Sequence, residues 1–136
     1  MNTLSPVMNL EVLAERSNEI QTLLERVEDR HVKVEDMELH VRSGEWLLWL
    51  VTDEDQCLHA LAITTFVYYP RVTAFRIIFT AGDNEDWASR MGELETFAAT
   101  NGAQEVEVLG RKGWERVLRD RGFEFQNITL SKRIIR

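Results

Sequence analysis

Three apolar runs in the middle of the chain constrain the fold more than any other feature of this sequence. They cover residues 46–51, 58–69 and 72–80. Short apolar runs that are rich in aromatic and β-branched residues and end at turn signals are typical of buried strands. The connections between them, residues 53–56 and the pair that begins at Pro70, are short enough to form hairpins. The sequence therefore predicts three consecutive antiparallel strands.

Helical patterns lie on both sides of these strands. Between Leu10 and Val27 apolar residues recur at spacings of three, four and seven, which predicts one helix of about five turns with Asn9 as its N-cap. Residues 31–44 are polar with some apolar residues at helical spacing, so a short second helix is an open alternative. A second long helical pattern covers residues 87–97 and ends at Gly102.

The last third of the chain alternates strand and helix patterns. Residues 105–108 alternate in polarity as in a half-exposed strand, and a short helix around Trp114 is expected to end at Gly122. Residues 123–134 predict a last strand whose face changes near Asn127, which indicates a bulge. The predicted fold is therefore α/β (α+β): a mixed sheet of antiparallel strands followed by helix, strand, helix and strand, with helices on both faces. With no repeat or linker in the sequence, residues 1–136 are expected to form one domain.

The charge of the chain disfavours two classes of partner. The net charge is −7, which disfavours direct binding to nucleic acid or to an anionic membrane. Residues 110–136 nevertheless hold eight basic and only three acidic residues. This asymmetry indicates either a docking surface or a solvated helix face. The N-terminus lacks a signal-peptide pattern and no apolar run is long enough to cross a membrane, so a soluble protein that is not exported by a signal peptide is expected.

Residues that often carry chemistry do not form a recognisable motif here. The three histidines are not at metal-ligand spacing, so no metal site is predicted. Cys57 is the only cysteine, which excludes an internal disulfide, and it is interpreted as a small buried thiol. The carboxylates of residues 35–38 and 53–55 are interpreted as turn and solvent-facing residues.

The C-terminal segment Gly110–Phe123, which reads GRKGWERVLRDRGF, resembles the end of the GNAT acyltransferase fold, where a short helix is closed by a Gly-Phe pair. More narrowly, the chain resembles GNAT-like proteins encoded by tailed bacteriophages, some of which belong with virion-assembly or internal-virion genes. That resemblance covers nearly the whole chain. The other positions that carry it are Tyr69-Pro70-Arg71, Gly82, Trp87, Leu94, Phe97-Ala98 and Gly102.

The coenzyme loop departs from the family pattern. In GNAT enzymes a glycine-rich loop after the strand equivalent to residues 72–80 presents backbone N–H groups to the pyrophosphate of acetyl coenzyme A. Residues 80–87 here read TAGDNEDW, with one glycine and three carboxylates. These carboxylates repel an anionic ligand, and as an alternative they favour the first turn of a helix. If the chain is an enzyme, the resemblance places the coenzyme on four residues: Phe79, Ala81, Gly82 and Asn84.

The general-acid position also departs from the family. Many GNAT enzymes have a tyrosine four residues before the glycine of the Gly-Phe pair, and this chain has Leu118 there. The asparagine that often precedes that tyrosine by seven residues falls on Arg111. Leucine has no proton to donate, so no catalytic residue is assigned.

The resemblance and its departures together predict a non-catalytic GNAT-like bacteriophage protein with a degenerate acetyl-CoA loop and no cofactor. It would act in virion assembly or structure, or on a host protein, in the host cytoplasm or the virion. The alternatives are a divergent acetyl-CoA-dependent N-acetyltransferase and an acidic decoy of nucleic acid. A homo-oligomer that joins the basic end of one copy to the acidic remainder of another is a further hypothesis. The residues expected to contact a protein partner are Arg111, Lys112, Trp114, Arg116 and Arg119, although Trp114 is equally well interpreted as a helix-to-sheet anchor.

Overall fold

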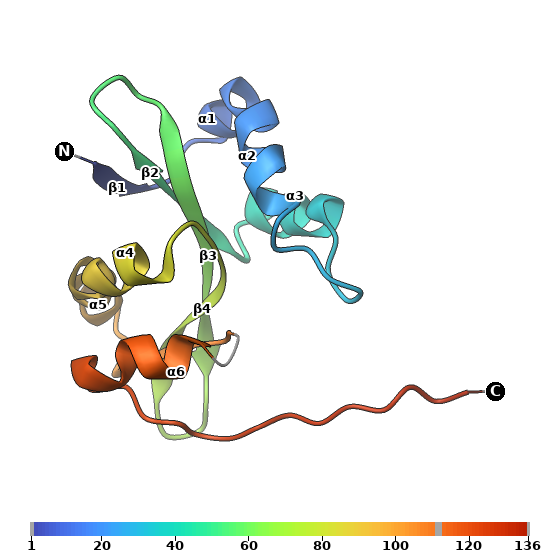
Figure 1. Ribbon diagram of the computed structural model, residues 1–136, viewed down its shortest axis with the longest axis vertical. Coiled ribbons are helices and arrows are strands. Elements are labelled where there is room, and N and C mark those ends of the chain that lie inside the picture. The colour runs from blue at the N-terminus through green and yellow to red at the C-terminus, as the bar shows by residue number, and fades with distance from the viewer. Residues whose placement is uncertain (1, 111–112, 136) are drawn as a thin grey trace.

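A five-stranded mixed sheet with helices on both faces forms the body of the computed structural model (Figure 1). The structure describes residues 2–110 and 113–135, and of Asn84 and Glu85 the backbone alone. The strands are β1 (Thr3–Pro6), β2 (Leu47–Thr52), β3 (Leu58–Tyr68), β4 (Thr73–Ala81) and β5 (Glu105–Val108). The helices are α1 (Leu10–Glu15), α2 (Ser17–Leu24), α3 (Val34–Arg42), α4 (Asn84–Ser89), α5 (Met91–Thr100) and α6 (Gly113–Leu118), and a 3-10 turn (Arg119–Arg121) follows α6.

The strands lie in the order β1-β2-β3-β4-β5, so each strand pairs with its neighbours in the chain. The pairings from β1 to β4 are antiparallel, and β5 joins β4 in parallel. A parallel neighbour requires a crossover, which α4 and α5 supply. The predicted mixed sheet with antiparallel strands first is therefore confirmed.

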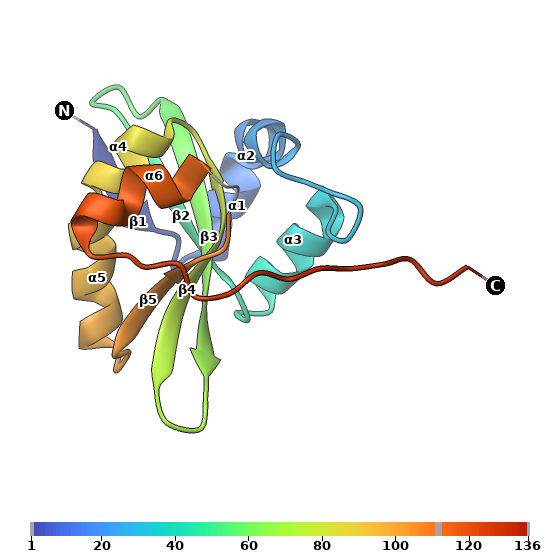
Figure 2. The same cartoon turned by 60° about the horizontal axis from the view of Figure 1, so that its bottom comes forward.

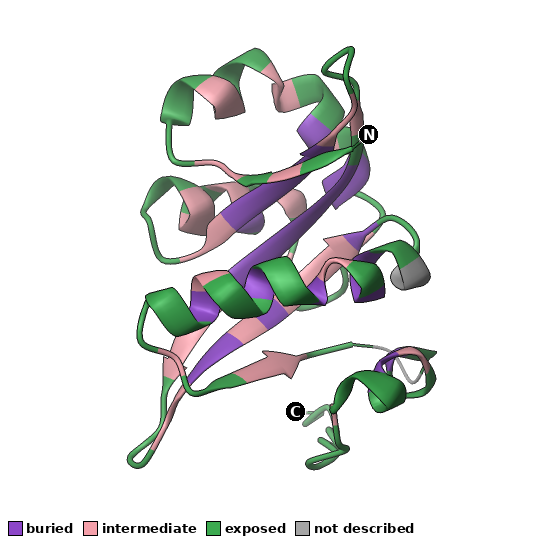
Figure 3. Ribbon diagram, turned by 90° about the vertical axis from the view of Figure 1, so that its left-hand side faces the viewer, coloured by how far each residue is buried: buried purple, intermediate pink, exposed green. Residues whose placement is uncertain are grey.

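Each face of the sheet has its own apolar core (Figures 1 and 2). Helices α1, α2 and α3 cover one face, where Leu48 and Leu61 are buried. Helices α4, α5 and α6 cover the other face, where Trp49 and Phe75 are buried. Because side chains alternate along a strand, both faces of β2, β3 and β4 contribute to a core, and Figure 3 shows buried residues along these strands. This double burial explains why their sequences are nearly continuous apolar runs.

Two predicted helices are each divided into two. The helix expected between Leu10 and Val27 breaks at Arg16, whose φ of −110° and ψ of 18° are not helical. The Arg16 guanidinium donates to the Gln56 carbonyl in the β2–β3 turn and pairs with Glu19, so contacts across the fold accompany the break. The helix expected over residues 87–97 becomes α4 and α5, with Arg90 between them. The short helix left open for residues 31–44 is present as α3.

The first strand and the last predicted strand also differ from expectation. Strand β1, which the sequence did not reveal, pairs with β2 from Thr3↔Thr52 to Pro6↔Trp49. The prediction of a strand over residues 123–134 is wrong, because the segment pairs with no strand. It passes α6 and extends beyond the sheet (Figures 1 and 2). Among the described residues, no helix is both long and apolar enough to span a membrane.

Candidate functional site

Strands β4 and β5 diverge at the point where the resemblance places a coenzyme. Their pairing ends at Ile77↔Val108, followed by a hydrogen bond of 3.0 Å from the Leu109 N–H to the Ile77 carbonyl. Strand β4 continues to Ala81, and no strand among residues 2–110 and 113–135 pairs with it on that side. The chain then turns at Gly82 into α4. A ligand that enters the sheet between two parallel strands would have to occupy this divergence.

The indole of Trp87 occupies the region beside this divergence. Its side chain is completely buried (0% exposed), and its Nε1–H donates to the Ala81 carbonyl at 3.2 Å. Trp114 and Leu118 from α6 belong to the same buried cluster. Helices α4 and α6 therefore pack on the sheet through these side chains.

A side chain at Gly82 would meet protein atoms rather than open space. Its φ of +125° lies in the left-handed region, which favours glycine. A Cβ at this position would lie 2.8 Å from the Ala60 Cβ and 3.4 Å from the Trp87 Nε1. The glycine is thus required by its own turn and by close packing against β3.

The first turn of α4 is capped by the chain itself. The Asp86 N–H donates to the Asp83 carboxylate at 3.4 Å, and the Trp87 N–H donates to the Asp83 carbonyl at 3.0 Å. The Asp86 carboxylate pairs with Arg90 at 3.5 Å. These contacts support the alternative in which the acidic residues stabilise a helix start. A pyrophosphate at this position would compete with the Asp83 carboxylate for the Asp86 N–H.

The residues that the resemblance assigned to a coenzyme lie at the end of β4, in the turn at Gly82 and at the start of α4. The side chains of Phe79 and Ala81 belong to the core beneath α1, α2 and α3. The Asn84 and Glu85 side chains lie outside the described part of the chain. Leu118, at the general-acid position, is 3% exposed and packs among aromatic side chains, where it has no proton to give.

The residues predicted to contact a protein partner divide into two groups. Arg116 and Arg119 are exposed on α6 and the 3-10 turn, and Arg119 pairs with Glu115 at 3.5 Å. Trp114 is only 7% exposed and packs over Gly110, where an added Cβ would lie 2.3 Å from its ring. Its position is that of the helix-to-sheet anchor rather than of a surface contact. The predicted contacts Arg111 and Lys112 lie outside the described residues.

A groove of about 1070 Å³ runs along the outer edge of β5, and the sequence did not predict it. It is lined by β5, by one side of α5 and α6, and by residues 123–129. The Tyr69 hydroxyl in this groove donates to the Glu107 carboxylate at 2.6 Å, and Arg76 donates to both at 2.8 and 2.9 Å. The carboxylate of Glu107 raises the pKa of Tyr69 because an ionised phenol could no longer donate to it.

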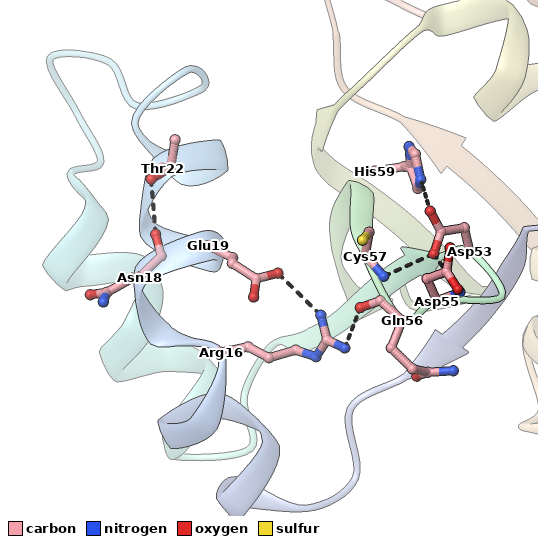
Figure 4. Close-up of polar contacts among 9 residues, drawn as sticks. All are labelled: Arg16, Asn18, Glu19, Thr22, Asp53, Asp55, Gln56, Cys57 and His59. Carbon is pink, nitrogen blue, oxygen red and sulfur yellow. Dashed lines mark hydrogen bonds and ion pairs between the residues drawn. The ribbon is translucent and has the colours of Figure 1, made fainter.

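A second polar cluster lies at the β2–β3 turn (Figure 4). The Asp53 carboxylate accepts the N–H groups of Asp55 and Cys57 and lies 2.7 Å from the His59 Nε2. The hydrogen bond with His59 holds the pKa of Asp53 below its ordinary value. Cys57 is exposed, so its interpretation as a buried thiol is wrong: it lies in the turn that these bonds close. Within residues 2–110 and 113–135, no group of three or more His, Cys, Asp or Glu side chains is placed to hold a metal ion.

Several solved structures with the same fold are described as acetyltransferases. One is a predicted acetyltransferase with acetyl-CoA from Clostridium acetobutylicum, with a TM-score of 0.67, 14% identity, and coverage of 98% of this chain and 96% of that chain. A glucosamine-6-phosphate N-acetyltransferase from Arabidopsis thaliana matches with a TM-score of 0.69 and 13% identity, and the match covers 99% of each chain. The aminoglycoside 6'-N-acetyltransferase AAC(6')-Ih from Acinetobacter baumannii matches with a TM-score of 0.70 and 10% identity, and the match again covers 99% of each chain.

Comparison at the level of sequence gives no further relatives. No family model matches the chain, and no curated protein matches it. At 10–14% identity the structural similarity speaks to the fold and not to the activity. The chain has the α+β fold of the GNAT acetyltransferases, with the mixed five-stranded sheet that the resemblance implied.

Proposed function

We propose that the chain is a non-catalytic GNAT-fold protein that works by binding other proteins. The observation that carries this proposal is the buried Trp87, which lies beside the divergence of β4 and β5 and donates to the Ala81 carbonyl. The self-capped start of α4 and the aliphatic Leu118 at the general-acid position point in the same direction. The resemblance to bacteriophage proteins supports a role in virion assembly or structure, or in binding a host protein.

Opening this region for a coenzyme would be costly. A coenzyme that displaced Trp87 would remove it from a core in which Trp49, Phe75 and Leu94 also lie, and a fully buried large aromatic side chain contributes about 3–5 kcal/mol by truncation. The anion would in addition meet the Asp83 and Asp86 carboxylates at the start of α4. The free energy of coenzyme binding would have to offset both the lost burial of Trp87 and this electrostatic repulsion.

The direct test is calorimetric titration of the purified chain with acetyl coenzyme A at physiological salt. The proposal expects no heat of binding up to millimolar ligand. Saturable binding in the micromolar range would contradict it.

A second candidate function is that of a divergent acetyl-CoA-dependent N-acetyltransferase. The observation that favours it is the set of solved structures above, which are acetyltransferases and match almost the full length of this chain. Its test is release of free coenzyme thiol in the presence of a panel of primary amines. Release that depends on both the amine and the protein would support it, and a rate equal to that without protein would leave the binding protein as the proposal.

A further inference from the structure

The C-terminal segment, residues 123–135, carries the three most exposed large apolar side chains that the structure describes. It is free of helix and strand along its described length, and it extends past α3 and away from the sheet (Figures 1 and 2). A hydrogen bond of 3.3 Å from the Arg30 guanidinium to the Ser131 hydroxyl ties it to the loop between α2 and α3. Its large apolar side chains with 64–92% exposure are Phe125, Ile128, Leu130, Ile134 and Ile135. Exposed apolar side chains gathered in one segment indicate an interaction surface.

The charge of this segment is opposite to that of the rest of the chain. Residues 125–136 hold three basic residues and no acidic one, whereas the whole chain has a net charge of −7. Lys132 and Arg133 form no ion pair with any residue that the structure describes. Charges more than about 8 Å apart are largely screened at physiological salt. Because the segment extends beyond the sheet, its own positive charge rather than the net charge decides which surface it binds.

The apolar side chains lie on both sides of the segment. Side chains alternate along an extended backbone, so Ile128 and Leu130 share one side and Ile135 lies on the other. A protein groove that binds an extended peptide selects every second side chain. A lipid interface is fluid, requires no complementary shape, and accepts apolar side chains at the boundary between headgroups and acyl chains. The distribution of apolar side chains therefore favours a lipid surface over a protein groove.

We propose that residues 128–135 bind to the surface of an anionic lipid bilayer. The isoleucine and leucine side chains enter the boundary between headgroups and acyl chains. Lys132 and Arg133 stay at the level of the lipid phosphates, with their aliphatic stems along the apolar layer. The net charge of the chain predicts the reverse, so the proposal assigns membrane binding to this segment and not to the body. This binding does not depend on whether the chain binds a coenzyme or another protein.

The test measures binding of the full chain to lipid vesicles by co-sedimentation at physiological salt. Vesicles of phosphatidylglycerol and phosphatidylcholine in equal parts should bind the chain at least about 30-fold more strongly than phosphatidylcholine alone. Lys132→Gln/Arg133→Gln should weaken binding to the anionic vesicles about 30-fold, because each basic residue near an anionic surface contributes about 1 kcal/mol. Ile134→Ser/Ile135→Ser should weaken it at least about tenfold, because two apolar side chains no longer enter the bilayer. Since these side chains are exposed, both variants should keep the thermal midpoint of the unaltered chain without vesicles.

The matched control is Arg42→Gln/Arg71→Gln. It removes two positive charges at exposed positions, at the end of α3 and in the β3–β4 turn, and should bind vesicles as the unaltered chain does. Hydrogen exchange locates the surface: the amides of residues 128–135 should gain protection when anionic vesicles are added.

Four results would each overturn the proposal. The first is absent binding to anionic vesicles, or equal binding to both kinds of vesicle. The second is a control variant that loses as much binding as the variant without Lys132 and Arg133. The third is protection of the amides of residues 128–135 before vesicles are added, which would mean that the body or a second copy covers the segment. The fourth is equally tight binding to polyglutamate, which would assign the segment to an acidic protein.

Discussion

The sheet is incomplete both at the end of β4 and at the outer edge of β5. The first place is covered by buried side chains, whereas the second remains open. At the end of β4 the strands diverge and buried side chains pack beside the divergence: Trp87 is fully buried and α4 is capped by Asp83. At the edge of β5 the backbone is unpaired, a groove remains, and exposed apolar residues lie in the segment that follows. Under the proposed function, the GNAT fold keeps its sheet while its binding surface lies away from the coenzyme position.

Truncating the packing at the end of β4 is expected to have the largest effect. Trp87→Ala removes a fully buried indole and should lower the free energy of unfolding by about 3–5 kcal/mol in urea denaturation. Tyr68→Ala is the matched control, because this aromatic side chain is 77% exposed and its loss should change stability by less than about 0.5 kcal/mol. Equal losses for the two variants would mean that Trp87 is not a core residue.

The turn at Gly82 gives a second and smaller test of the same region. Gly82→Ala forces a Cβ to 2.8 Å from the Ala60 Cβ at a φ of +125°, and should cost about 1–3 kcal/mol of unfolding free energy. Gly92→Ala is its counterpart in α5, where nothing lies within 4 Å of the new Cβ. That variant should stabilise the protein by about 0.5–1 kcal/mol, because alanine is the better helix former. If both changes were tolerated equally, the close packing of the turn against β3 would be refuted.

Restoring a tyrosine at the family's general-acid position tests whether the missing proton donor alone prevents acetyl transfer. Leu118→Tyr inserts a larger side chain with a hydroxyl into the cluster that holds Trp87 and Trp114, and should cost about 1–3 kcal/mol. We expect no release of coenzyme thiol from this variant, because under the proposed function the site does not bind the coenzyme. Thiol release well above that of the unaltered chain would show that the site binds the coenzyme and would contradict the proposal.

The smallest effect is expected at the β5 edge, where Glu107 holds Tyr69. Glu107→Gln removes the carboxylate that raises the pKa of Tyr69, so this pKa should fall toward its ordinary value in an ultraviolet titration. Because the pKa in the folded chain lies above that in the unfolded chain, the bond contributes stability at neutral pH and loses it as pH rises through the folded-state pKa. An unchanged titration in the variant would mean that the Tyr69–Glu107 hydrogen bond does not form in solution.

The sequence was sufficient to predict the secondary structure where the hydrophobic periodicity of a segment agrees with its burial. The apolar runs that became β2, β3 and β4 are buried on both faces, and the turns at Gly102 and Gly122 adopt the positive φ expected of helix-ending glycines. It failed where distant contacts decide the local structure. The break at Arg16 accompanies its bond to Gln56, forty residues away, and no local pattern carries that information.

The candidate surfaces were predictable only in part. The departure of the loop from the family pattern could be recognised from its carboxylates, and that of the general-acid position from Leu118, because charge and a missing proton donor are visible in the sequence itself. The open edge of β5 could not be predicted, because residues 123–134 have the sequence pattern of a strand. In the structure they form no strand and pair with none. A strand pattern specifies a propensity, and its partner is a property of the fold or of a second chain.

The most direct test of the central claim, that the coenzyme region of this GNAT fold is closed, is calorimetric titration with acetyl coenzyme A on the unaltered chain at physiological salt. A closed region predicts no binding heat to millimolar ligand for the unaltered chain. Saturable micromolar binding with one site per chain would contradict the claim, and would mean that Trp87 and the Asp83 cap give way to the coenzyme.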